Sequence, residues 1–112
     1  MQVMRIGAAT AYLPEMHVNM VAILLQKYRL ASGGVMTVVL SHYLPGGRAE
    51  WEAAKSPKVY IVLRGEITVT TASDEVVLYP YDSCLIYENE RRLVENRTNN
   101  PASMLVVSCV QS

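Results

Sequence analysis

Only a few side chains in this sequence are of the types that usually carry out chemistry. There are two histidines, His17 and His42, and two cysteines, Cys84 and Cys109. A histidine can serve as a general base or a metal ligand, but a lone histidine is more often a surface residue or a hydrogen-bonded core residue. Each cysteine lies in an apolar, strand-like run, which favours a buried reduced thiol over a disulfide.

The aromatic residues are the second chemical feature of the chain. It contains seven Tyr and one Trp but no Phe. A tyrosine combines an apolar ring with a polar hydroxyl, so it suits a position where a core meets a cavity or an interface. We therefore expect some of these hydroxyls to reach a cavity or an interface of a small β domain.

Length and charge exclude several classes of function. The 112 residues predict one domain, and the formal net charge of zero lacks the basic footprint of a nucleic-acid-binding protein. No apolar run approaches the roughly 20 residues of a membrane helix. The segment that begins with Met1 has no apolar signal-peptide core, so we expect a cytoplasmic protein without a membrane partner.

The elements that must position these side chains are strands, and the clearest pair lies in Lys58–Thr71. Val59–Leu63 is a dense run of β-branched and apolar residues, which predicts a strand buried on both faces. Glu66–Thr70 alternates polar and apolar residues, which predicts a strand buried on one face. Arg64-Gly65 between them is typical of a tight hairpin turn. This hairpin is the predicted centre of the fold.

The rest of the chain predicts further strands around this hairpin. Val18–Leu30 is compatible with a helix or a strand, and we favour a strand because turn residues follow it at Ala31–Gly34. Leu44–Gly47 predicts a turn, and the polar segment Arg48–Pro57 predicts a loop towards its end. About eight short strands separated by turns indicate an all-β sandwich or small barrel. The other predicted strands are 35–43, 75–79, 84–87, 91–95 and 103–110.

Several of these segments together resemble a small single-domain cupin. The resemblance covers about residues 35–110 and implies a jelly-roll (double-stranded β-helix) barrel. Residues 1–34 would then form N-terminal strands and an arm of the same domain. The segments that carry the resemblance are Pro45-Gly46-Gly47, Lys58–Glu66, Tyr79–Ser83, Asn96 and Pro101–Val107.

The resemblance also locates the positions where cupins hold a metal ion, and here the sequence departs from the family. Gly46 and Gly65 match the glycines that bound the first cupin motif, but Glu52, Ala54 and Lys58 stand at the three ligand positions between them. In the second motif only Asn96 matches, and Arg92 stands at the ligand position. Alanine has no donor atom, and neither a charged lysine nor an arginine offers a lone pair. We therefore expect no metal cofactor.

Both basic residues would project into the barrel, where an unpaired charge is costly. One interpretation is that Lys58 and Arg92 flank a mostly apolar pocket and hold a small anionic or enolic molecule. The arginine would bind a carboxylate with its fork of donors, and a lysine with a lowered pKa could transfer a proton. Such a site suits a metal-independent isomerase, cyclase or decarboxylase. The remaining predicted site residues are Tyr60, Val62, Trp51 and Tyr87 as ligand contacts, with Glu52 or His42 as general base.

Two other interpretations stay open. In the first, Lys58 pairs with Glu52 and Arg92 pairs with Glu88 or Glu90, and the barrel is a structural or ligand-sensing protein. A slip of one residue would instead turn Lys58 outward into solvent. In the second, the protein is a metal-dependent, dioxygenase-like cupin with the unusual ligand set His17, His42 and Glu52.

We also expect a homodimer. The segment Val18–Leu25 supplies more apolar surface than one small barrel needs for its own core, and open edge strands invite pairing with a second copy. Cupins commonly pair in this way, so the resemblance implies the same.

Overall fold

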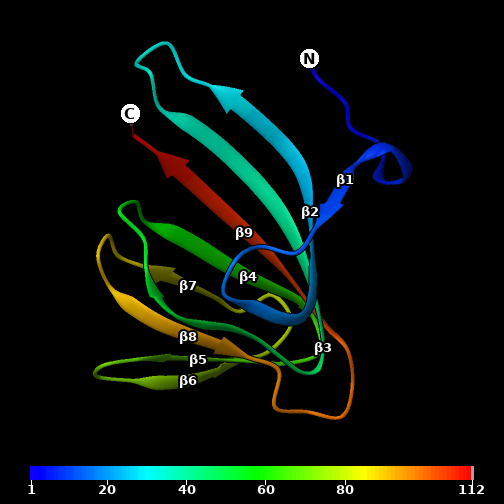
Figure 1. Ribbon diagram of the computed structural model, residues 1–112, viewed down its shortest axis with the longest axis vertical. Helices are drawn as coiled ribbons and strands as arrows, with labels where there is room; N and C mark the ends of the chain where they lie inside the picture. The colour runs from blue at the N-terminus through cyan, green and yellow to red at the C-terminus, as the bar shows by residue number, and fades with distance from the viewer. Residues whose placement is uncertain (112) are drawn as a thin grey trace.

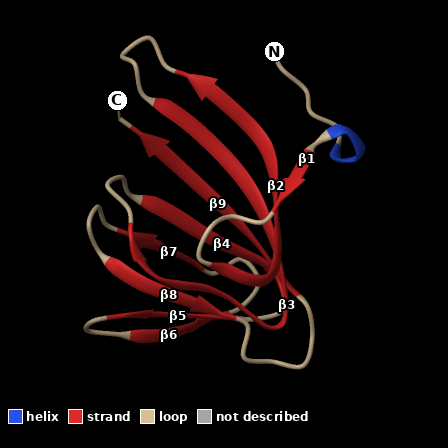
Figure 2. Ribbon diagram, viewed as in Figure 1, coloured by secondary structure: helices blue, strands red, loops and turns tan. Residues whose placement is uncertain are grey.

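The chain folds into a curved sheet that closes almost completely into a barrel, as the computed structural model of residues 1–111 shows (Figures 1 and 2). The predicted all-β jelly roll is confirmed. Within residues 1–111, no helix is long and apolar enough to cross a lipid bilayer. The elements are η1 (Ile6–Ala8), β1 (Thr10–Tyr12), β2 (His17–Arg29), β3 (Val35–Ala53), β4 (Lys58–Arg64), β5 (Ile67–Thr71), β6 (Glu75–Leu78), β7 (Ser83–Ile86), β8 (Arg91–Glu95) and β9 (Ala102–Val110).

Strand β3 runs through both halves of the barrel. The strands follow the order β6-β5-β8-β3-β9-β4-β7, and β2 pairs with β3 and β1. The first part of β3 pairs with β9, from Val35 opposite Val110 to Tyr43 opposite Ala102. Its second part pairs with β8 and places Glu52 opposite Arg92. One long strand therefore belongs to both halves of the barrel (Figure 1).

The segment Leu44–Gly47, predicted as a turn between strands, is instead a bend within β3. Gly46 has a positive φ of 79°, and a Cβ on Gly47 would collide with the carbonyl oxygen of Asn19 on β2. Backbone hydrogen bonds tie Gly46 and Gly47 to Asn96 at 3.0 and 2.9 Å. Turn residues supply the conformations that bend a chain, but here β2 pairs with β3 on both sides of the bend.

The predicted hairpin at Lys58–Thr71 is wrong in its pairing, although both strands exist. β4 pairs with β7 and β9, whereas β5 pairs with β6 and β8. Gly65 does have the expected positive φ, at 74°, and a Cβ there would lie 2.8 Å from the carbonyl oxygen of Pro101. The connection therefore carries the chain from one half of the barrel to the other.

Burial also differs from the expectation for these two strands. In β4 only the inward-facing Tyr60 and Val62 are buried, so this strand is buried on one face. In β5 three consecutive residues, Ile67, Thr68 and Val69, are buried. The neighbouring strands decide burial, and the run of apolar residues alone could not identify them.

Other differences lie at the ends of strands. The polar first part of Arg48–Pro57 belongs to β3, and the loop predicted towards the end of this segment follows Ala53, where β3 ends. The irregular start of the chain includes the short strand β1, which pairs with β2. Cys84 and Cys109 are free and only half-buried. The sequence around β1 is weakly patterned, and its pairing with β2 determines the structure there.

Candidate functional site

A cavity of about 340 Å³ opens inside the barrel. Its lining comes from the β1–β2 connection and from β2, β3, β4, β7, β8 and β9. Tyr43, Tyr60 and Arg92 are buried at its inner end, together with apolar residues such as Met104. Its rim is polar, because the lining residues Glu15 and Glu52 are exposed to solvent. The cavity thus has a buried cationic end and an acidic mouth.

Arg92 is the most unusual residue of this cavity, because it is a charged residue only 7% exposed. Its Nε–H donates to the hydroxyl oxygen of Tyr60 at 2.8 Å, and Nη1 donates to the carbonyl oxygen of Glu50 at 2.8 Å. The ion pairs within residues 1–111 are Arg48–Glu50, Arg97–Glu75 and Arg97–Glu95, so no carboxylate of that range pairs with Arg92. The guanidinium is held in place but not neutralised.

Lys58 lies on β4 and lines the same cavity, half-buried. Burial lowers the pKa of its ammonium group, and the positive charge of Arg92 lowers that pKa further. The carboxylate of Glu52 acts in the opposite direction, but no ion pair joins the two residues within residues 1–111. The structural alternative of two compensating ion pairs, Lys58–Glu52 and Arg92 with Glu88 or Glu90, is therefore not what the described part of the chain forms.

Two tyrosine hydroxyls accompany Arg92 at the inner end. Burial raises the pKa of Tyr43 and of Tyr60, and the charge of Arg92 only partly offsets this effect. Both phenols therefore keep their protons at neutral pH. Because the Tyr60 oxygen accepts a hydrogen bond from Arg92, its own O–H proton is available to a ligand. The inner end thus offers phenol and guanidinium donors side by side.

His17 also lines this cavity, although the sequence suggested it only as a metal ligand alongside His42 and Glu52. Its Nδ1 lies 2.6 Å from the carbonyl oxygen of Glu15. A carbonyl oxygen only accepts, so Nδ1 carries the proton and Nε2 keeps its lone pair. Burial lowers the pKa of this imidazole, although the Glu15 hydrogen bond acts in the opposite direction. Nothing in the sequence signals this position, because only the pairing of His17 with Ala49 brings it to the barrel.

The structure thus brings four of the predicted site residues together, namely Lys58, Glu52, Arg92 and Tyr60. The other four lie elsewhere. His42 alternates with the lining residues Ser41 and Tyr43, so it faces away from the cavity, and its Nδ1 hydrogen-bonds the hydroxyl of Ser103 at 2.7 Å. It is not placed to act as the base of this cavity.

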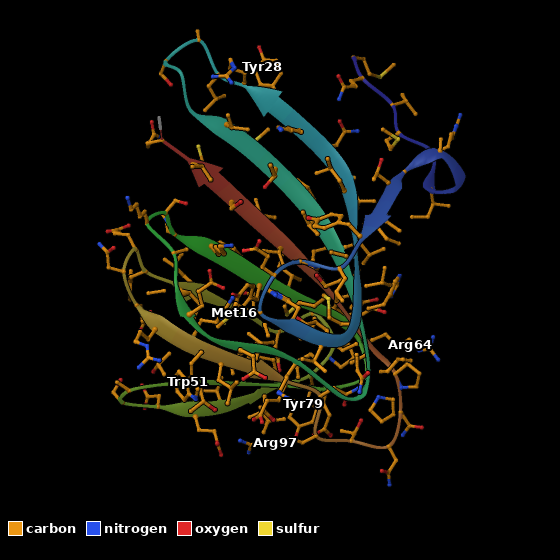
Figure 3. All side chains as sticks on the ribbon, viewed as in Figure 1. Met16, Tyr28, Trp51, Arg64, Tyr79 and Arg97 are labelled. Carbon is orange, nitrogen blue, oxygen red and sulfur yellow. The ribbon has the colours of Figure 1, made fainter. Side chains whose placement is uncertain are left out.

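The expected aromatic wall does not form. Trp51, labelled in Figure 3, is 37% exposed, and its ring lies 5.6 Å from the guanidinium carbon of Arg91. Tyr87 is 61% exposed. Val62 is fully buried in the core but is not part of the cavity lining. A register irregularity in β3 between Ala49 and Glu52 changes the alternation of side chains there, which sequence spacing alone does not reveal.

The positions at which cupins hold a metal ion can now be tested against the donor set. All four positions, Glu52, Ala54, Lys58 and Arg92, line this cavity. One carboxylate, one methyl group and two cationic side chains do not fit a divalent metal ion. Within residues 1–111, no three His, Cys, Asp or Glu side chains are grouped to hold a metal. The alternative set of His17, His42 and Glu52 does not assemble, because His42 faces away.

The pKa of Lys58 provides a direct test of this electrostatic arrangement. We expect Lys58, labelled by reductive ¹³C-methylation and followed by NMR, to titrate below its ordinary pKa in the folded protein and to return to it in urea. Arg92→Met should raise the folded-state pKa, because a neighbouring positive charge is removed, and Glu52→Gln should lower it further. Identical titrations in all three proteins would contradict the arrangement.

Two sequence comparisons find known proteins that are similar to this chain. A family model described as "Cupin domain" matches residues 39–108. The chain is 35% identical over 106 residues to a protein of Mycobacterium tuberculosis (strain ATCC 25618 / H37Rv) named "Beta-D-galactosidase Rv1717". That alignment covers 95% of this chain and 91% of the relative.

Two solved structures show the same architecture. Protein TT1209 from Thermus thermophilus is 25% identical with a TM-score of 0.76, and the match covers 100% of both chains. An RmlC-like cupin from Shewanella frigidimarina NCIMB 400 is 12% identical with a TM-score of 0.81. That match covers 98% of this chain and 91% of the other.

Proposed function

The chain belongs to the cupin family, and we propose that its barrel binds a small organic molecule bearing a carboxylate or an enolate oxygen, without a metal ion. Arg92 is the anchor of this ligand. A negatively charged or enolic oxygen enters the cavity past the acidic mouth and meets the donors of Arg92, Tyr43 and Tyr60 at the buried end.

The observation that carries this proposal is the buried, unneutralised guanidinium of Arg92. A buried cation costs several kcal/mol unless a counter-charge or a polar cavity compensates for it. Two hydrogen bonds, to Tyr60 and to the Glu50 carbonyl, hold the fork in a fixed orientation and leave its other N–H groups for a ligand. The cavity volume of about 340 Å³ suits a molecule of a few to a dozen heavy atoms.

The same cavity contains groups that can move protons. Lys58 has a lowered pKa and lies within electrostatic reach of Arg92, and Glu52 lies at the rim. Acid–base groups beside a fixed oxyanion site are the requirements of isomerisation, cyclisation or decarboxylation through an enolate. We therefore place proton-transfer chemistry of this kind at the site.

A thermal-unfolding and calorimetric screen tests the binding step. We expect pyruvate, acetoacetate or benzoate to raise the unfolding temperature, because a ligand that binds only the folded state stabilises it. Matched compounds without the carboxylate, such as acetone and benzamide, should have a much smaller effect. Equal effects of the acids and of their neutral analogues would contradict the role of Arg92.

A second candidate function is glycoside hydrolysis, which a specific feature of the cavity favours. Three glutamates, Glu15, Glu52 and Glu90, line it, and glycosidases commonly use a pair of carboxylates. The 35% identical relative carries the name of a β-D-galactosidase. If this candidate is right, the protein hydrolyses 4-nitrophenyl β-D-galactopyranoside, and Glu52→Gln or Glu90→Gln lowers the rate about 100-fold. Absence of hydrolysis by the unaltered protein would exclude it.

We further propose that two copies associate through the outer face of the sheet formed by β2, β3, β9 and β4. Ile23, Leu40, Leu105 and Ile61 lie opposite one another in register across these strands, on the face away from the cavity. All four are partly exposed. A continuous apolar row of this kind is self-complementary under a two-fold axis.

Leu105→Glu tests this association. A charge in the middle of the apolar row should convert a dimer into a monomer in sedimentation velocity, because desolvating it in an interface is costly. Val77→Glu, an exposed apolar position on β6, is the matched control and should leave the dimer intact. A monomeric unaltered protein at micromolar concentration would contradict the proposal.

A further inference from the structure

The connection between β1 and β2 lines the cavity, and this connection and the start of β2 have an unusual backbone conformation. Met16, labelled in Figure 3, has a positive φ of 62°, and Asn19 has one of 51°. Left-handed backbone is unfavourable for a side chain such as methionine and persists where surrounding structure enforces it. The backbone N–H of Glu50 donates to the Met16 carbonyl oxygen at 2.8 Å, which fixes this segment to β3.

These two positions bracket His17. Between them, His17 pairs with Ala49 and Val18 pairs with Arg48, so the imidazole is fastened at the mouth and lines the cavity. The hydrogen bond from Nδ1–H to the Glu15 carbonyl fixes the tautomer as well as the ring. A ring held in this way presents Nε2, with its free lone pair, as its reactive atom.

The charged groups facing His17 come from three other strands. Glu52 on β3, Lys58 on β4 and Arg92 on β8 all act on its electrostatics. The deeper donors are the hydroxyls of Tyr43 and Tyr60 and the guanidinium of Arg92, all buried. The imidazole is only half-buried. The cavity therefore has a proton acceptor, the imidazole of His17, near the solvent. Its hydrogen-bond donors for an oxyanion lie at the buried end.

We propose that His17 is the general base of this cavity and that the substrate is a 2-oxo or 3-oxo carboxylate with an acidic C–H next to its carbonyl group. This inference rests on the proposed function, because Arg92 must hold the oxygen end. His17 Nε2 takes the proton, and the C–H electron pair becomes the C=C bond of an enolate. The former carbonyl π pair moves to oxygen, where Tyr43, Tyr60 and Arg92 stabilise it. Return of the proton to carbon or to oxygen completes a tautomerisation without any oxidant or cofactor.

Solvent exchange in D₂O provides the test, with pyruvate, 2-oxobutyrate and acetoacetate as probes followed by proton NMR. At least one probe should bind and exchange its C–H protons faster than in buffer. His17→Asn should lower this exchange about 100-fold with less than about a 3-fold change in Kd, because the asparagine δ-nitrogen can still donate to the Glu15 carbonyl. His42→Asn, on the opposite face of β3, is the matched control and should change neither quantity.

Two further readouts separate a base from a residue that only supports the loop. Nitrogen-15 NMR should show the Nδ1–H tautomer. The exchange rate should rise with pH as the imidazole loses its proton. It should reach its plateau at a pH below the ordinary pKa of histidine, because burial lowers the pKa of His17. Exchange that persists at full rate in His17→Asn, with binding intact, would overturn the role of His17 alone. Failure of every probe to bind would overturn the proposed function, and this inference with it.

Discussion

Arg92→Met is expected to weaken binding of small carboxylates strongly while leaving the folded protein as stable as before or more stable. The binding loss should be about 3 kcal/mol, roughly 100-fold in Kd, because a buried charge-assisted hydrogen bond to the ligand disappears. The variant loses the hydrogen bonds to Tyr60 and to the Glu50 carbonyl, worth about 1 kcal/mol each. Removing an uncompensated buried cation stabilises the folded protein by a comparable or larger free energy.

Urea unfolding measures the free energy of unfolding of the variant, and isothermal titration calorimetry measures its Kd for the carboxylate. Arg91→Met is the matched control, because Arg91 is the preceding residue of β8 and lies over Trp51 on the outside. It should change neither binding nor stability by more than about 1 kcal/mol. A large loss of stability in Arg92→Met with unchanged binding would identify Arg92 as a structural residue and refute the proposed anchor.

Asn96→Ala is expected to cause the largest loss of stability in the chain, about 3–4 kcal/mol. This residue is 1% exposed, and its side-chain amide makes four hydrogen bonds. Nδ2 donates to the carbonyl oxygens of Tyr43 and Asn100, and Oδ1 accepts from the backbone N–H and the hydroxyl of Thr98. Buried partners left without a bond cost about 1 kcal/mol or more each.

Asn99→Ala serves as the control for this prediction, since Asn99 lies in the same connection and is exposed. Its free energy of unfolding should stay within about 0.5 kcal/mol of the unaltered protein. If Asn96→Ala lost less than about 1 kcal/mol, the bend of β3 and the 97–101 connection would not depend on this amide.

The strands were largely predictable from sequence, but their pairing was not. Local patterns of apolar residues and turn residues locate β4, β5 and β9, because alternation and positive-φ glycines are local properties. The same glycine signal at Gly65 and Gly46 was compatible with a hairpin, a crossover or a bend. Only the partners that each strand finds in three dimensions distinguish these outcomes, and those partners are distant in sequence.

The residues of the candidate site were also predictable only in part. Lys58, Glu52 and Arg92 could be predicted, because the resemblance placed them at positions that line a barrel, and all three line the cavity. His17 was suggested only as an alternative metal ligand with His42 and Glu52, because it lies outside the matched residues 39–108 and reaches the cavity through the pairing of β2 with β3. Trp51 was misplaced because the β3 irregularity between Ala49 and Glu52 changes which side chains face inward.

The position of β9 between β3 and β4 has a consequence for how the protein is made. The ribosome produces β9 after β1–β8, yet β9 holds the two preceding groups of strands together through pairs such as Val39–Val106 and Tyr60–Val106. During translation, the edges of β3 and β4 that pair with β9 therefore lack their hydrogen-bond partners, and such open edges are prone to aggregation. Closure of the barrel must be a late event that follows emergence of residue 110 from the exit tunnel, and a nascent chain stalled before β9 should need a chaperone to remain in solution.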